Sequence, residues 1–272
     1  MSARIWADDE ARAIASTVVA SLPLSLEWAH KDADVLVLGG SGGWTRRAAT
    51  AMGSSSTQAA VIVSPSPTPP YEVRKLRMAA GGTPVLIDND YMSDPAVQTL
   101  WSWRPDGPGL LECTVAAPLN TDPYAGLLDA ALFLGTAFGA LPLVSSAIVE
   151  RDRIAVAGGL CLAGVRGVAS LRVILTDSLE PSLCVSWVSA TNHLRATLYP
   201  SETARPALVH LSDDDGETLL PTLYESGHRA SVRRLLKALD AGGATDDLDD
   251  LLDALTFVDE VRAQASVKAA TL

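Results

Sequence analysis

The chain has 272 residues, 48% of them hydrophobic, and a formal net charge of −11 at pH 7. This length and apolar content exclude a disordered tail and a disulfide-stabilised miniprotein, because they suffice for one large or two modest buried cores. The acidic charge argues against non-specific nucleic-acid binding, which needs a basic face. The charge is uneven: residues 1–105 carry nine Lys and Arg against ten Asp and Glu, and the rest carries twelve against 22, which suggests two units.

The first unit is predicted from Ala3 to Asp90, where short apolar runs alternate with segments of helical spacing. The apolar runs are Arg4–Ala7, Leu24–Trp28, Val35–Leu38, Ala60–Val63 and Val85–Ile87. The helical segments are Ala11–Ala20, Thr45–Met52 and Tyr71–Ala80. This alternation predicts a shortened doubly wound, Rossmann-like parallel sheet with helices on both faces. Ligands of such sheets bind beyond the carboxyl ends of the strands.

The pattern changes after the Pro- and Gly-rich segment Trp101–Gly109, which predicts a boundary near residue 105. Four segments then alternate apolar and polar residues, as strands with one packed face do. These segments are Leu110–Ala116, Ala169–Leu175, Leu183–Trp187 and His193–Leu198. Tyr124–Phe138 is apolar enough to cover that face as a helix, and helical spacing returns in His228–Gly243 and Asp246–Gln264. We therefore predict an α/β chain with a Rossmann-like domain at 1–105. The second domain, at 106–272, is predicted as α+β, with an open, mainly antiparallel sheet and C-terminal helices.

The compartment is predicted from what the sequence lacks. Three acids, Asp8, Asp9 and Glu10, stand where a secretion signal would be apolar, and the most apolar run, Leu127–Val144, contains an acid, two glycines and a proline. The three cysteines, Cys113, Cys161 and Cys184, are far apart, and the four histidines form no ligand cluster. We expect a cytoplasmic protein with reduced cysteines, no metal and no membrane contact.

The glycine-rich segment Gly39–Gly43 lies between a predicted strand and a predicted helix, the context of a phosphate loop. It matches neither G-x-G-x-x-G nor a Walker loop, so two interpretations stay open: a plain turn, or an amide cradle for a nucleotide. The next strand end contributes two serines to the second interpretation. The candidate cofactor-binding residues are Gly39, Gly40, Ser41, Gly42, Ser64 and Ser66.

Several motifs together resemble the Gfo/Idh/MocA family, named after glucose–fructose oxidoreductase and inositol dehydrogenase. Gly126–Asp129 resembles the start of that family's buried helix, and the alternating strands within Ala169–Leu211 resemble its open sheet. Ala60–Pro65 and Val85–Asp90 resemble two of its strand ends, and His228–Gly243 its closing segment. The resemblance implies a Rossmann domain joined to an α/β domain, NAD(P)-dependent redox chemistry, and oligomer contacts through the open sheet face.

The departures from that family lie at its chemical groups. The glycine-rich turn after the first strand is replaced by Asp8-Asp9-Glu10, whose carboxylates would repel a pyrophosphate by roughly 1–4 kcal/mol per charge pair at about 4 Å. The resemblance places the family's lysine on Asn89 and its histidine on Gly126. The leading hypothesis is therefore a degenerate family member without dinucleotide chemistry, acting as a non-redox catalyst or a partner subunit.

Two alternatives remain. One is an active NAD(P)-dependent reductase or dehydrogenase of a small carbonyl or imine, with Tyr124 as acid. The other is an interaction protein whose first domain resembles the receiver domain of response regulators. In a receiver the third strand ends in the Asp that accepts the phosphoryl group, but here it ends in Gly39, so this domain could not be phosphorylated. The candidate catalytic residues are Tyr124, Asn89 and His193. We also expect a small-molecule ligand in an interdomain crevice, and a homo- or hetero-oligomer formed through the polar sheet face. That face carries Arg172, Ser186, His193, Arg195 and Thr197.

Overall fold

The computed structural model describes residues 2–30, 32–53, 57–102, 109–138, 143–145, 159–161, 167–203, 205–243, 245 and 247–269. They form two compact units, of which one comprises Met1–Ser93 with Gly227–Leu252 and the other Asp94–Ser226 with Asp253–Leu272. The segment Gly227–Leu252 thus joins the first unit, although the sequence places it after the predicted boundary. The boundary at residue 105 stays a prediction about where independently folding domains divide.

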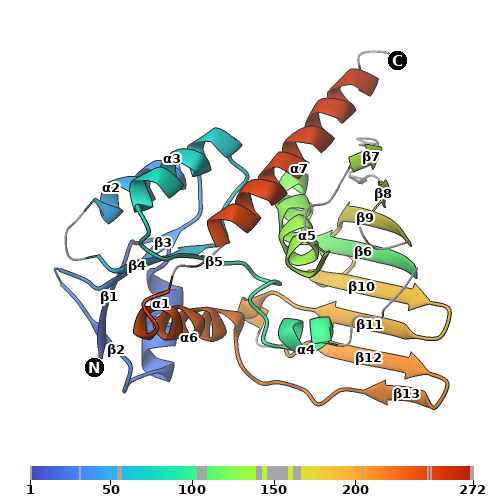
Figure 1. The fold of residues 1–272 in the computed structure, drawn as a ribbon, viewed down its shortest axis with the longest axis horizontal. Coiled ribbons are helices and arrows are strands. Elements are labelled where there is room, and N and C mark those ends of the chain that lie inside the picture. The colour runs from blue at the N-terminus through green and yellow to red at the C-terminus, as the bar shows by residue number, and fades with distance from the viewer. Residues whose placement is uncertain are drawn as a thin grey trace. The chain divides into compact units, whose positions relative to one another are not determined.

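The first unit contains a five-stranded parallel sheet of order β2-β1-β3-β4-β5. Its strands are β1 (Ala3–Ala7), β2 (Leu26–Trp28), β3 (Val35–Gly39), β4 (Ala59–Val63) and β5 (Val85–Asp88). Its helices are α1 (Arg12–Ser21), α2 (Trp44–Met52), α3 (Pro70–Ala80) and α6 (Gly227–Asp240). Figure 1 shows α2 and α3 on one face of the sheet and α1 and α6 on the other. The predicted doubly wound sheet is confirmed.

Burial on both faces explains why these strands are continuous apolar runs. All residues of β3 and β4 are buried. On the α1 and α6 face, strand residues such as Ile5 and Val37 pack with Val18 and Leu235 in one core cluster. The link from β2 to β3 has only six residues. This suffices because β2 ends opposite Ile5 of β1 and β3 begins opposite the same residue, so the chain need not run back along the sheet.

Side chains of the segment after α6 form hydrogen bonds with the outer edge of β5. The Ile87 N–H donates to Asp247 Oδ2 at 2.9 Å, and the Thr245 hydroxyl donates to the Val85 carbonyl at 2.8 Å. Arg234 of α6 donates to both oxygens of the buried Asp247, at 3.1 and 2.7 Å. The acid-rich start of α7 (Asp247–Ala269) therefore contributes to the sheet as well as to its own helix.

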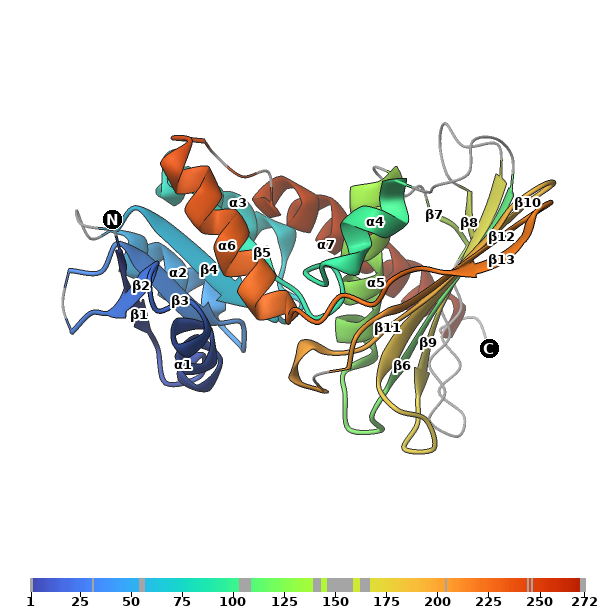
Figure 2. The ribbon, with the colours of Figure 1, turned by 90° about the horizontal axis from the view of Figure 1, so that it is seen from below.

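The second unit contains an eight-stranded sheet of order β13-β12-β11-β10-β6-β9-β8-β7. Its strands are β6 (Gly109–Ala117), β7 (Leu143–Ser145), β8 (Gly159–Cys161), β9 (Gly167–Leu175), β10 (Ser182–Ser189), β11 (His193–Leu198), β12 (Leu208–Asp213) and β13 (Gly216–Leu219). Among the described pairings only β6 with β9 is parallel, so the predicted mainly antiparallel sheet is confirmed. Figure 2 shows this sheet nearly edge-on.

One face of the second sheet is packed by α5 (Pro123–Phe138), which contacts β6 and β9. At Gly126 in its first turns, a Cβ atom would lie 3.0 Å from Val173 Cγ1. The glycine therefore lets α5 approach the sheet closely, and any side chain at this position would have to displace Val173. A short helix, α4 (Ala96–Ser102), adds a ring contact of 4.7 Å between Trp101 and Phe133.

Within the part of the chain that the structure describes, no helix combines the length and apolarity needed to cross a membrane.

Candidate functional site

The candidate site lies at the carboxyl ends of the parallel strands of the first unit. The strand order 2-1-3-4-5 reverses direction between β1 and β3, and open α/β sheets bind ligands at such a switch point. Asp8 follows β1 there. Gly39 is the last residue of β3, and Gly40 comes directly after it. The contacts across this switch point therefore decide what can bind.

Asp8 bridges the two strand ends. Its Oδ1 accepts hydrogen bonds from the Ala11 N–H at 2.9 Å and from the Gly39 N–H at 3.1 Å. The first bond satisfies a backbone donor just before α1, where the positive end of a helix would attract an anion. The carboxylate of Asp8 thus stands where a dinucleotide-binding sheet places phosphate.

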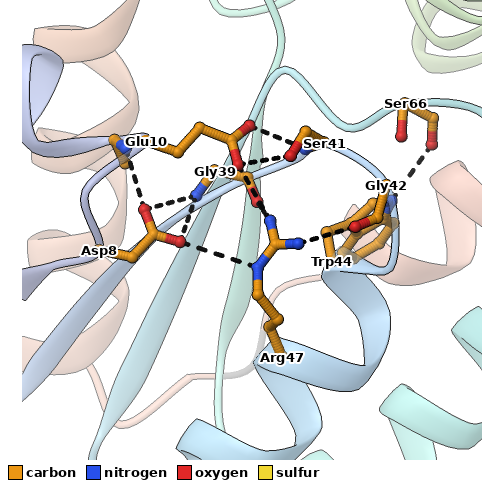
Figure 3. Close-up of polar contacts among 9 residues, drawn as sticks. Asp8, Glu10, Gly39, Ser41, Gly42, Trp44, Arg47 and Ser66 are labelled. Atoms are coloured by element: carbon orange, nitrogen blue, oxygen red, sulfur yellow. Dashed lines mark hydrogen bonds and ion pairs between the residues drawn. The ribbon is translucent and has the colours of Figure 1, made fainter.

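Glu10 fills the turn after β3 (Figure 3). Its Oε1 accepts from the Ser41 N–H at 2.9 Å, and its Oε2 accepts from the Ser41 hydroxyl at 2.6 Å and from Arg47 Nη2 at 3.0 Å. A Cβ atom at Gly39 would lie 2.1 Å from Glu10 Cδ. The carboxyl group of Glu10 therefore packs directly on the α-carbon of Gly39, in space that a side chain at position 39 would take.

Arg47 of α2 completes this cluster. Its Nη2 also donates to the Gly39 carbonyl at 2.7 Å, and its Nη1 donates to the Gly42 carbonyl at 2.8 Å. Its Nε lies 4.0 Å from Asp8 Oδ2. One guanidinium thus neutralises part of the charge of two carboxylates and holds the glycine-rich turn in shape.

The end of β4 packs against the same turn. Gly40 donates its N–H to the Val63 carbonyl at 2.8 Å and accepts from the Ser66 N–H at 2.7 Å, so a Cβ atom at Gly40 would lie 2.4 Å from the α-carbon of Pro65. Ser64 is exposed and has a positive φ of 46°, a conformation that costs energy for a residue with a side chain. The structure therefore brings together the candidate cofactor-binding residues of the sequence, with their backbone groups engaged in turn contacts.

Asn89 follows β5 and organises a turn. Its side-chain oxygen accepts from the Tyr91 and Met92 N–H groups, both at 3.0 Å, and its own N–H donates to the Ser93 hydroxyl at 3.1 Å. Asn89 is 1% exposed. These bonds give it a structural role that explains its residue type, and a catalytic role for it stays a prediction.

A buried acid–histidine pair lies beside Asn89, and the sequence indicates only its acid, at a strand end, and not the pairing. Asp88 is 1% exposed, and its two carboxylate oxygens accept from His228 Nδ1 at 2.7 Å and from the Ser231 hydroxyl at 2.8 Å. An ionised carboxylate only accepts, so the Nδ1 of His228 carries the proton whenever Asp88 is ionised. No local motif links residues that are 140 positions apart, so only the register of α6 on β5 could have revealed the pair.

The other two candidate catalytic residues lie in the second unit, on opposite sides of its sheet. Tyr124 belongs to α5, on the packed face, and the Arg262 guanidinium stacks 4.3 Å from its ring centre. His193 lies on the polar face, where its Nε2 is 3.0 Å from the Ser186 hydroxyl. The structure therefore does not bring Tyr124 and His193 together, and their roles stay predictions. Among the described residues no cluster of His, Cys, Asp and Glu could hold a metal.

Together these observations define a two-unit α/β protein with a Rossmann-like parallel sheet and a second, mainly antiparallel sheet. No family model matches the sequence, and no curated protein matches it. Solved structures resemble it closely in fold. The 3-ketoreductase KijD10 from Actinomadura kijaniata, in complex with NADP and TDP-benzene, has a TM-score of 0.68 at 16% identity, over 97% of this chain and 98% of that one.

Two further structures agree. The dehydrogenase MviM from Clostridium difficile gives a TM-score of 0.75 at 7% identity, over 97% of this chain and 99% of that one. The UDP-N-acetylglucosamine 3-dehydrogenase GnnA from Acidithiobacillus ferrooxidans gives a TM-score of 0.71 at 16% identity, over 96% of this chain and 89% of that one. The fold is therefore that of Gfo/Idh/MocA-type dehydrogenases, and at these identities the likeness concerns the fold alone.

This fold implies a dinucleotide at the switch point, so the residues present there can be compared with that ligand. The N–H groups of Ala11, Gly39 and Ser41 already donate to carboxylates of the chain. The space over the α-carbon of Gly39 holds the carboxyl group of Glu10. The described residues therefore do not fit a dinucleotide pyrophosphate at this place.

Proposed function

We propose that the chain is a member of the Gfo/Idh/MocA family that has lost dinucleotide binding at the switch point and serves as a non-redox catalyst or a partner subunit. Family membership is supported by a fold likeness that covers nearly the whole chain and both units. The chemistry of the strand ends supports the loss.

One observation carries this proposal: Asp8 and Glu10 occupy the backbone donors on both sides of the switch point. A pyrophosphate placed about 4 Å from either carboxylate would be repelled by roughly 1–4 kcal/mol per charge pair. It would also have to compete for N–H groups that are already bonded. Both effects act on binding, so they weaken any dinucleotide regardless of the reaction.

Equilibrium dialysis of the purified chain against NADH and NADPH tests the proposal. We expect no binding at micromolar concentrations of either dinucleotide. Circular dichroism of the same sample verifies that the protein is folded. Micromolar binding of NADH or NADPH would refute the proposal.

A second candidate function is NAD(P)-dependent reduction or oxidation of a small carbonyl or imine, and the structural neighbours favour it. All three are named as reductases or dehydrogenases, and KijD10 is described in complex with NADP. Tyr124, beside the Arg262 guanidinium, is the proposed acid of this candidate.

Oxidation of NADPH against a panel of carbonyl and imine compounds separates the two candidates. Turnover by the wild-type chain that falls in the Tyr124→Phe variant would support the second candidate. The matched control is Tyr224→Phe, because Tyr224 is 86% exposed and lies in the same unit. Activity that survives in both variants would refute the role of Tyr124.

A further inference from the structure

The turn between β3 and α2 has the donors of an anion site, and the anion comes from the chain itself. A backbone N–H and a hydroxyl, both of Ser41, and the guanidinium of Arg47 converge on the Glu10 carboxylate over distances of 2.6 to 3.0 Å. Backbone N–H groups in a glycine-rich turn together with arginine are also the donors that proteins use for phosphate.

We infer that Glu10 is an internal substitute for a phosphate group, and that its carboxylate keeps a phosphate-ester site at this turn closed. This inference rests on the proposed function, because it concerns one of the two carboxylates that would exclude a diphosphate. It adds that the donors of Ser41 and Arg47 can still bind a phosphate group once the Glu10 carboxylate is removed.

The space at the turn supports this inference independently of the donors. The carboxyl group of Glu10 lies where a Cβ of Gly39 would be, 2.1 Å from Cδ and 2.5 Å from Oε2. Without the Glu10 side chain, the α-carbon of Gly39 would present an open surface beside the Ser41 N–H. A phosphate oxygen needs this kind of close approach to the backbone.

Glu10 differs from its two acidic neighbours in a way that makes it the removable group. Asp8 is held by two backbone N–H groups, one of them that of Ala11, the residue before α1. The Asp9 side chain is fully exposed, and among the described residues its one ion pair is with Arg12, at 3.6 Å. The Glu10 side chain is 42% exposed, so its removal leaves no buried cavity.

Isothermal titration calorimetry with inorganic pyrophosphate tests the inference. The variants are Glu10→Ala, Glu10→Gln, Asp9→Asn and the double variant Glu10→Ala with Arg47→Gln. Asp9→Asn is the matched control, since it removes the same charge one residue away without vacating the turn. Glu10→Gln removes the charge but keeps the shape of the side chain, and it replaces the alanine variant in the titration if that variant folds poorly.

We expect Glu10→Ala to bind pyrophosphate at least about tenfold more tightly than the wild type, a difference of about 1.4 kcal/mol. Glu10→Gln should gain less, Asp9→Asn little, and the double variant should lose the gain because Arg47 is part of the site. Equal affinity of Glu10→Ala and the wild type would overturn the inference, as would an equal gain in Asp9→Asn. Neither result touches the proposed function, which fails instead if the wild-type chain binds NADH or NADPH in dialysis.

Discussion

Replacing Asp88 by alanine should destabilise the first unit strongly, because this carboxylate joins β5 to α6 from a buried position. Asp88 is 1% exposed, and its two oxygens accept hydrogen bonds at 2.7 and 2.8 Å from His228 and Ser231. The alanine removes both bonds and takes the acceptor away from two side chains that stay largely buried. Each charge-assisted bond contributes about 1.5–3 kcal/mol, so the total loss should be about 3–5 kcal/mol.

Urea unfolding followed by circular dichroism measures this loss. With a slope of about 1–3 kcal/mol per molar urea, the midpoint should fall by at least about 1 M. Asp214→Ala is the control, since Asp214 is exposed in the β12–β13 turn, and it should stay within about 0.5 kcal/mol of the wild type. A double-mutant cycle of Asp88→Ala with His228→Ala should give a coupling of about 1–3 kcal/mol. Additive effects, or a loss below about 1 kcal/mol in Asp88→Ala, would show that the pair does not hold α6 on β5.

Three further predictions concern single residues. Burial raises the pKa of Asp94 to about 6 from 3.8, against the opposing bond from the Ala96 N–H, so its ionisation costs stability as pH rises from about 4 to about 6. Asp94→Asn should therefore raise stability at pH 7 by on the order of 1–3 kcal/mol and flatten urea midpoints measured between pH 4 and 7; an unchanged slope contradicts this. Burial, together with the nearby Cys184, raises the pKa of Cys113 to about 12, so iodoacetamide at pH 8 should leave Cys113 unlabelled in the native chain and label it in urea, as peptide mass spectrometry can measure. Gly40→Ala should cost about 1–3 kcal/mol in urea unfolding, because its Cβ would meet backbone atoms at 2.4–2.5 Å, whereas Gly42→Ala, with no atom within 4 Å, should be near neutral.

The fold could be predicted from the sequence because hydrophobic periodicity reports burial directly. The continuous run at β3 is buried on both faces, and the alternation at β10 places Leu183, Val185 and Trp187 on one packed face. The return of α6 to the first unit could not be predicted in this way. Its apolar stripe at Val232 and Leu235 indicates a packed helix but does not say which core it joins.

The candidate site was predicted in part. The position of the glycine-rich turn followed from its place between a strand and a helix. The carboxylates of Asp8 and Glu10 were expected to repel phosphate; the structure shows the N–H groups from which they accept, and their effect on phosphate binding stays a proposal. Their individual partners depend on side-chain direction, which no periodicity encodes: Asp9 points to solvent while Glu10 reaches Ser41. Asp88 was assigned to a strand end, but its pairing with His228 is a long-range contact without a local signal.

The bonds from Thr245 and Asp247 to β5 have a consequence for how the protein behaves in a crowded solution. An edge strand with unpaired N–H and C=O groups is a template on which a strand of another molecule can add. Here the outward carbonyl of Val85 and the outward N–H of Ile87 are already taken by side chains of the same chain. The segment that closes the first unit thus also protects this edge of the sheet against intermolecular strand pairing and aggregation.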